Sequence, residues 1–123
     1  LTFVFVTHNL AVVNYFSDNI VVMYLGMVVE KAPSAELFDH PLHPYTRALL
    51  SAILVPEVGA NQKRVPLRGE LSSPIDPPNE CRFAKRCGYY CEACDNGIPP
   101  LIEVSRDHFV ACHRVASPDS KLD

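Results

Sequence analysis

The sequence predicts an α/β fold that ends in a small, irregular, cysteine-rich module. Residues 2–6 and 19–24 are short apolar runs rich in β-branched and aromatic side chains, which is typical of strands. Residues 10–16 and 45–53 instead show apolar side chains at helical spacing. All five cysteines fall between Cys81 and Cys112, outside this alternating part. The first half is therefore expected to be α/β and the second half to depend on its thiols.

The first expected strand, residues 2–6, is apolar throughout, as in a parallel sheet buried on both faces. Asn9 is a good N-cap for the helix expected at 10–16, which has one apolar face. Because the chain begins at Leu1 without an initiator Met and its first residues already form an expected core strand, we expect a fragment of a longer protein. Its apolar surface should then drive self-association, through Val4, Val6, Val12, Val21 and Val22.

Residues 19–30 are predicted to form a β-hairpin that turns at Leu25 and Gly26. A short helix should follow at 33–38, then a longer helix at 45–53, in which Tyr45, Leu49 and Leu50 are expected to pack inside. His40 and His43 each precede a proline, which favours an extended backbone. A structural role for these two histidines is favoured over a metal site.

Five prolines between residues 56 and 80 predict a linker or an extended, wrapping segment. Residues 81–114 form the cysteine-rich block, which ends in a strand-like run at 108–112. The polar tail from Val115 is expected to be disordered. The predicted division is 1–54 for the α/β part, 55–114 for the cysteine-rich region and 115–123 for the tail.

Composition limits the function classes. The 123 residues are 48% hydrophobic and 20% charged, with a net charge of -3, which is ordinary for a globular protein but too acidic for non-specific nucleic-acid binding. Residues 61–123 hold nine basic side chains, but nine acidic ones accompany them. There is no signal-peptide pattern, and no apolar run approaches the roughly 20 residues of a spanning helix.

Two segments resemble a known family. Phe5-Val-Thr-His8-Asn-Leu, followed by Tyr24-Leu-Gly-Met-Val-Val-Glu30, resembles the end of an ABC ATPase domain, where a strand delivers the switch-loop histidine. His40-Pro-Leu-His-Pro-Tyr-Thr46 and the cysteine block resemble the oligopeptide/dipeptide importer subfamily. The likeness covers residues 2–114, and it implies the C-terminal edge of a RecA-like ABC ATPase core followed by a Cys-rich, metal-binding module.

The resemblance implies the ATP-binding subunit of a peptide ABC importer, which couples ATP binding and hydrolysis to oligopeptide or dipeptide uptake. His8 would contact the γ-phosphate. The implied partners are a second ATP-binding subunit and membrane-spanning permease subunits, at the cytoplasmic face of the membrane. The sequence has no Gly-x-x-x-x-Gly-Lys-Ser/Thr, no strand ending in Asp-Glu and no Leu-Ser-Gly-Gly-Gln. ATP and magnesium are thus expected only in the intact subunit, and this chain should not hydrolyse ATP alone.

Four cysteines match the family's ligand positions, with five, six and seventeen residues between them: Cys81, Cys87, Cys94 and Cys112. Four thiolates can hold a [4Fe–4S] cluster or zinc; the resemblance favours the cluster, with zinc as the alternative. Arg82, Lys85, Arg86 and Arg114 would offset its negative charge. The chain departs from the family at Gly88, usually a proline, and at Cys91, an extra thiol that can substitute for Cys94. The alternative to a metal site is that these cysteines are reduced and buried, or partly disulfide-linked, and bind no metal.

Two other functions stay open at this point. A zinc-ribbon-like adaptor or nucleic-acid-binding module would use the basic residues after position 60, although they lack interleaved aromatic side chains for base stacking. An electron-transfer protein would use the cluster but leaves the strand–histidine–helix half unexplained. The importer subunit accounts for both halves.

Overall fold

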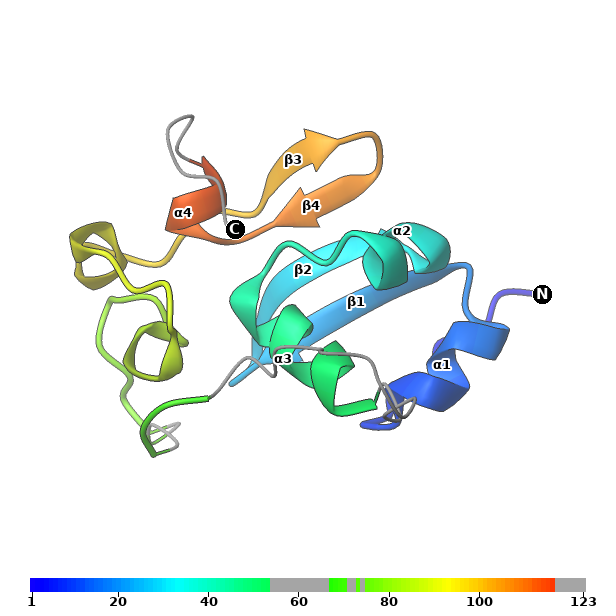
Figure 1. Cartoon of the computed structure of the whole chain (residues 1–123), viewed down its shortest axis with the longest axis horizontal. Helices are drawn as coiled ribbons and strands as arrows, with labels where there is room; N and C mark the ends of the chain where they lie inside the picture. Colours follow the sequence, from blue (N-terminus) through cyan, green and yellow to red (C-terminus); the bar gives the residue numbers. More distant parts are fainter. Residues whose placement is uncertain (54–66, 71–72, 74, 117–123) are drawn as a thin grey trace, which may run out of the picture.

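The computed structural model describes residues 1–53, 67–70, 73 and 75–116. Its centre is a four-stranded sheet made of β1 (Asn19–Tyr24), β2 (Met27–Pro33), β3 (Ile102–Ser105) and β4 (His108–Val110). The strand order is β1-β2-β4-β3, and each neighbouring pair is antiparallel (Figure 1). The two central strands thus come from opposite ends of the chain.

The β1–β2 hairpin forms as its sequence predicts. Side chains of β1 alternate between exposed and buried, which places Ile20, Val22 and Tyr24 in the core. Leu25 and Gly26 make the turn with φ of 45° and 78°, as two-residue hairpin turns require. β2 runs three residues further than the expected end at residue 30, because its later residues continue to pair with β1.

Three helices lie beside this hairpin: α1 (Leu10–Phe16), α2 (Ser34–Asp39) and α3 (Pro44–Ile53). Asn9 caps α1, as predicted, by accepting a hydrogen bond from the Val12 N–H at 3.4 Å. α2 contacts β1 and β2, and α1 contacts both α2 and α3. Of the residues expected to pack, Leu50 is buried and the partly buried Tyr45 and Leu49 pack against the core.

The cysteine-rich half shares this core. Three short helices flank the β3–β4 hairpin along the chain: η1 (Ala84–Arg86) and η2 (Glu92–Asp95) precede it, and α4 (His113–Ala116) follows it. β4 pairs with β2 through Glu30 opposite Val110. Phe83 is only 2% exposed, and its ring centroid lies 5.2 Å from that of Tyr24. The β3–β4 hairpin thus extends the sheet built by β1 and β2 (Figure 1), and Phe83 packs in its core.

Two expectations for the first half are wrong. Residues 2–6 form no strand, and Val4 and Val6 are 88% and 98% exposed, because no neighbouring strand of the described residues pairs with them. The described sheet is antiparallel, as the hairpin predicted at 19–30 requires, and the structure has an α/β fold; the RecA-like edge stays a prediction. Val22, expected at the exposed surface, is only 6% exposed.

The expectations for the later segments have mixed outcomes. Of the linker predicted at 56–80, residues 56–66, 71–72 and 74 lie outside the described residues. The strand expected at 108–112 is β4, which ends at Val110, and the strand that pairs with it, β3, was not predicted. The tail expected from Val115 begins inside α4, and residues 117–123 again lie outside the described part.

Candidate functional site

His8 lies in the turn that precedes α1, and its side chain is exposed. The turn is shaped by its two neighbours: the Asn9 N–H donates to Thr7 Oγ1 at 3.0 Å, and Asn9 then caps the helix. These bonds leave the imidazole outside the helix and directed away from the core. The position can therefore offer a proton donor or acceptor to a ligand that approaches from outside.

A buried polar cluster joins β2, the loop before α3, and β4. Glu30 is fully buried. Its Oε1 accepts from the Leu42 N–H at 2.8 Å and from His108 Nε2 at 2.7 Å, and its Oε2 accepts from the His43 N–H at 2.9 Å. His108 is also fully buried, and its Nδ1 lies 3.4 Å from Glu36 Oε1. Sequence reasoning missed this cluster, because Glu30 and His108 are 78 residues apart.

His43 is buried and serves the backbone, as its place before a proline suggested. Its Nδ1 accepts from the Tyr45 N–H at 3.0 Å, which caps the first turn of α3. Burial lowers the pKa of His43 from its ordinary value of 6.5 to about 4, because charging an imidazole in the core costs desolvation energy. A neutral ring is what the cap needs, since a protonated Nδ1 cannot accept.

The five thiols lie in one region, and none is in a disulfide. Cys94 and Cys112 are buried and the other three are half-buried. The Cys81 N–H donates to the Cys94 carbonyl at 2.8 Å, so the backbone at Cys81 is joined to that of η2. The Sγ atoms of Cys91 and Cys94 are 3.6 Å apart.

Burial raises the pKa of four of the thiols. The pKa rises to about 11 for Cys87 and to about 12 for Cys94, and burial also raises it for Cys81 and Cys112. In each case the charge of Cys91 contributes further, in the same direction. Cys91 is thus close enough to raise the pKa of each of the other four thiols, and these four stay protonated at neutral pH unless a cation replaces the proton.

The fit of a metal centre to these residues is partial. In the described parts of the chain, no group of three or more His, Cys, Asp or Glu side chains is gathered closely enough to hold a metal ion. The all-thiol donor set nevertheless has the chemistry of a thiolate-ligated centre. The Nε atoms of Arg82 and Arg86 are buried without a hydrogen-bond partner; such groups suit a nearby anion. The thiol donors are therefore of the right chemical type, but metal binding would require their sulfur atoms to move closer to one another.

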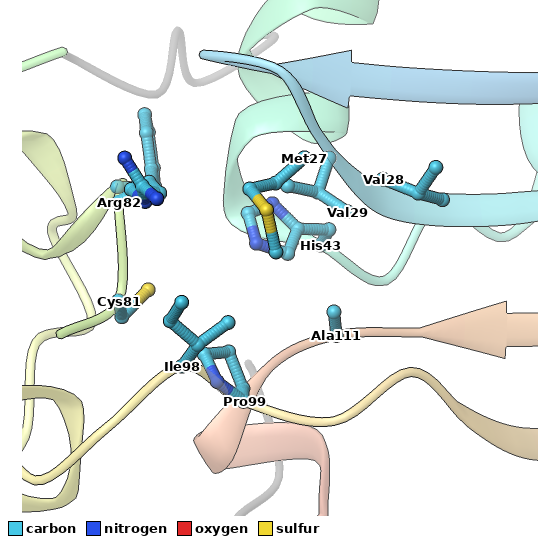
Figure 2. Close-up of a pocket in the computed structure, with 10 residues that line it drawn as sticks. Met27, Val28, Val29, His43, Cys81, Arg82, Ile98, Pro99 and Ala111 are labelled. Atoms are coloured by element: carbon cyan, nitrogen blue, oxygen red, sulfur yellow. The ribbon is translucent and has the colours of Figure 1, made fainter. Parts of the chain in front are cut away.

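Cys81 and Arg82 also line a small pocket against the sheet (Figure 2). Met27, Val29 and His43 form the facing wall, while Ile98 and Pro99 lie at its lower edge in Figure 2. The pocket measures about 20 Å³, which is room for about one water molecule. A pocket of this size is too small for an organic substrate.

Comparison with known proteins identifies the family. The family model described as "Oligopeptide/dipeptide transporter, C-terminal region" matches residues 29–94. This span holds β2 from Val29 onwards, the loop at 40–43 that Glu30 anchors, α3 and the first four cysteines. The chain belongs to this family. The resemblance noted from His40 to Thr46 and from the cysteine block is confirmed.

Similar full-length proteins carry matching names. AppF of Bacillus subtilis, an oligopeptide transport ATP-binding protein, is 46% identical over 115 residues, covering 92% of the chain and 35% of AppF. A Brucella ovis protein named for peptide import and ATP binding is 48% identical, covering 93% of the chain and 36% of that protein. The chain thus spans about a third of the length of these relatives. No helix in the described residues is long and apolar enough to cross a membrane.

Proposed function

We propose that this chain is the C-terminal part of the ATP-binding subunit of a peptide ABC importer, which couples ATP binding and hydrolysis to oligopeptide or dipeptide uptake. The observation that carries the proposal is the similarity of 92–98% of the chain to peptide and oligopeptide transport ATP-binding proteins. Residues 1–54 would complete the ATPase domain, and residues 55–114 would form its Cys-rich region.

In this role His8 would be the switch-loop residue. The turn before α1 is well suited to it, because Thr7 and Asn9 fix the backbone while the imidazole stays exposed. The missing phosphate-binding and signature segments would come from the rest of the subunit, together with the ATP and magnesium sites. The exposed apolar residues before α1 would form the C-terminal edge of the RecA-like core, as a strand paired with that remainder.

The partners would be a second ATP-binding subunit, which completes the nucleotide sandwich, and membrane-spanning permease subunits at the cytoplasmic face of the membrane. The loop at 40–43, which Glu30 anchors, would hold the family's His-Pro-Tyr-Thr segment, residues 43–46, in place in this assembly. Glu30 fixes the loop to the sheet by accepting from the Leu42 and His43 N–H groups, and His43 and Thr46 are buried, so the segment would keep one shape.

The thiol region would hold a [4Fe–4S] cluster, with zinc as the alternative, through Cys81, Cys87, Cys94 and Cys112. Such a group would supply structural cross-linking, since four protein ligands leave no open position for a substrate. The guanidinium groups of Arg82 and Arg86 would balance the charge of the thiolates. Their unpartnered, buried Nε atoms support this assignment.

A chimeric transporter tests the importer proposal. The segment of AppF that this chain matches is replaced by residues 1–114, and peptide uptake is measured in cells that lack AppF. We expect uptake to be restored and His8→Ala to reduce ATP hydrolysis at least 100-fold, about 3 kcal/mol of transition-state stabilisation, with ATP binding retained. Tyr15→Ala, an exposed change on α1, is the control. A folded chimera that binds ATP but shows the same hydrolysis with and without His8 contradicts the assignment.

A second experiment tests the metal centre. Iron, sulfide and zinc are measured in anaerobically purified protein, together with the visible absorption spectrum. We expect near-stoichiometric iron and sulfide, lost in Cys81→Ser and retained in Cys91→Ser. Zinc alone would keep a structural site but replace the cluster. A folded protein without metal contradicts the proposed centre, yet it leaves the importer assignment untouched.

A further inference from the structure

Cys91 lies outside the four proposed ligands, although it can substitute for Cys94, and its sulfur lies beside that of Cys94. It lies directly before η2, and the Cys94 N–H donates to the Cys91 carbonyl at 2.8 Å. This turn places both side chains on one side, with the Sγ atoms 3.6 Å apart. A disulfide needs about 2.05 Å between the sulfurs, a gap that small side-chain rotations can close.

Hydrogen bonds hold this turn from several directions. The Tyr90 hydroxyl donates to Asp95 Oδ2, so the residues on either side of the pair are joined. Asn96 Nδ2 donates to the Glu92 carbonyl at 3.1 Å, and the Cys81 N–H donates to the Cys94 carbonyl. The backbone is therefore fixed in the geometry that brings the two thiols together, before any bond forms between them.

We propose that Cys91 and Cys94 form a redox-active dithiol, which is reversibly oxidised to a disulfide by low-molecular-weight disulfides. Cys91, the more exposed of the two, attacks one sulfur of the reagent as a thiolate, and the first small thiol leaves. Cys94 then attacks the Cys91 sulfur of the mixed disulfide, and the second small thiol leaves. Two cysteine thiols and one small disulfide thus give one protein disulfide and two small thiols.

This dithiol does not depend on the metal centre, but the two compete. Cys94 is a proposed ligand, and a disulfide removes its thiolate from the donor set. The extra thiol at position 91 would therefore give this chain a way to lose the metal under oxidising conditions and to regain it after reduction. The proposal concerns the metal-free protein, so its test does not need a loaded centre.

The test uses the metal-free full chain equilibrated with oxidised glutathione. We expect the number of alkylatable thiols to fall from five to three, and dithiothreitol to restore all five. Cleavage after Arg86, Glu92 and Glu103 gives peptides 87–92 and 93–103, which separate Cys91 from Cys94. These two peptides should be recovered joined by a disulfide, and fragmentation should find Cys87 alkylated.

Two variants make the assignment specific. Cys91→Ser should abolish the link between the two peptides, whereas Cys87→Ser, which removes the other thiol of peptide 87–92, should keep it. The proposal is overturned if the wild-type chain keeps five alkylatable thiols, if the disulfide joins another pair, or if the reaction stops at a mixed disulfide with glutathione. The wild-type result decides the question even where a variant fails to fold.

Discussion

At the scale of single residues, His43 shows how burial fixes a protonation state. Its pKa of about 4 in the folded chain lies below the 6.5 of an exposed histidine. Between these values the unfolded chain binds a proton that the folded chain does not, so stability is complete above pH 6.5 and falls as the pH drops towards 4. We expect this residue alone to remove about 3 kcal/mol over that range.

Urea unfolding at pH 7.5 and pH 4.5 measures this loss. In His43→Asn the amide oxygen can still accept from the Tyr45 N–H, so the cap on α3 is kept while the titrating group is gone. The variant should lose distinctly less stability than the wild type between the two pH values. His40→Asn, which replaces an exposed histidine in the same way, is the matched control variant measured at the same two pH values. Equal pH dependence in the wild type and His43→Asn would refute this account.

At the scale of elements, one buried carboxylate ties three segments together. Glu30→Gln replaces an oxygen that accepts with an NH₂ that donates, so one of the donors aimed at position 30 loses its partner. We expect the free energy of unfolding to fall by about 2–4 kcal/mol. Glu36→Gln removes the carboxylate on the other side of His108, but that side chain is 38% exposed, so its loss should cost less than about 1 kcal/mol. Equal losses measured by urea unfolding would contradict the cluster's role.

The same cluster marks where prediction from sequence stops. The β1–β2 hairpin, the cap of α1 and the helix of α3 follow from local periodicity and turn chemistry, and all were predicted. The pairing of β2 with β4 was not, because neither Glu30 nor His108 carries a local signal for a partner 78 residues away. The four cysteine ligands were implied by the family resemblance and stay a prediction, whereas the 3.6 Å approach of the Cys91 and Cys94 sulfurs depends on the turn at η2 and could not be derived from the sequence.

At the scale of the whole molecule, apolar side chains before and along α1 are left uncovered. Phe3, Phe5 and Phe16 are 70%, 71% and 75% exposed, which is unusual for aromatic residues. A groove lined by Phe5, Val6, Val12, Val13 and Phe16 runs between the first segment and the helix. In the full-length relatives, about two thirds of the chain is available to cover such a face. Without that covering, we expect this chain to self-associate through it.

Light scattering of the purified chain over a range of concentrations tests this expectation. The unmodified chain should exceed the monomer mass, and Phe5→Glu with Phe16→Glu should return it to a monomer, because two charges in the groove oppose its burial. Ile75→Glu is the matched control, since Ile75 is 78% exposed but lies outside the groove; this variant should still associate. A monomeric wild-type chain would show that the apolar face is tolerated in water. Association that survives the double substitution would place the contact elsewhere, for which the exposed side of β1, with Val21 and Met23, is the next surface to test.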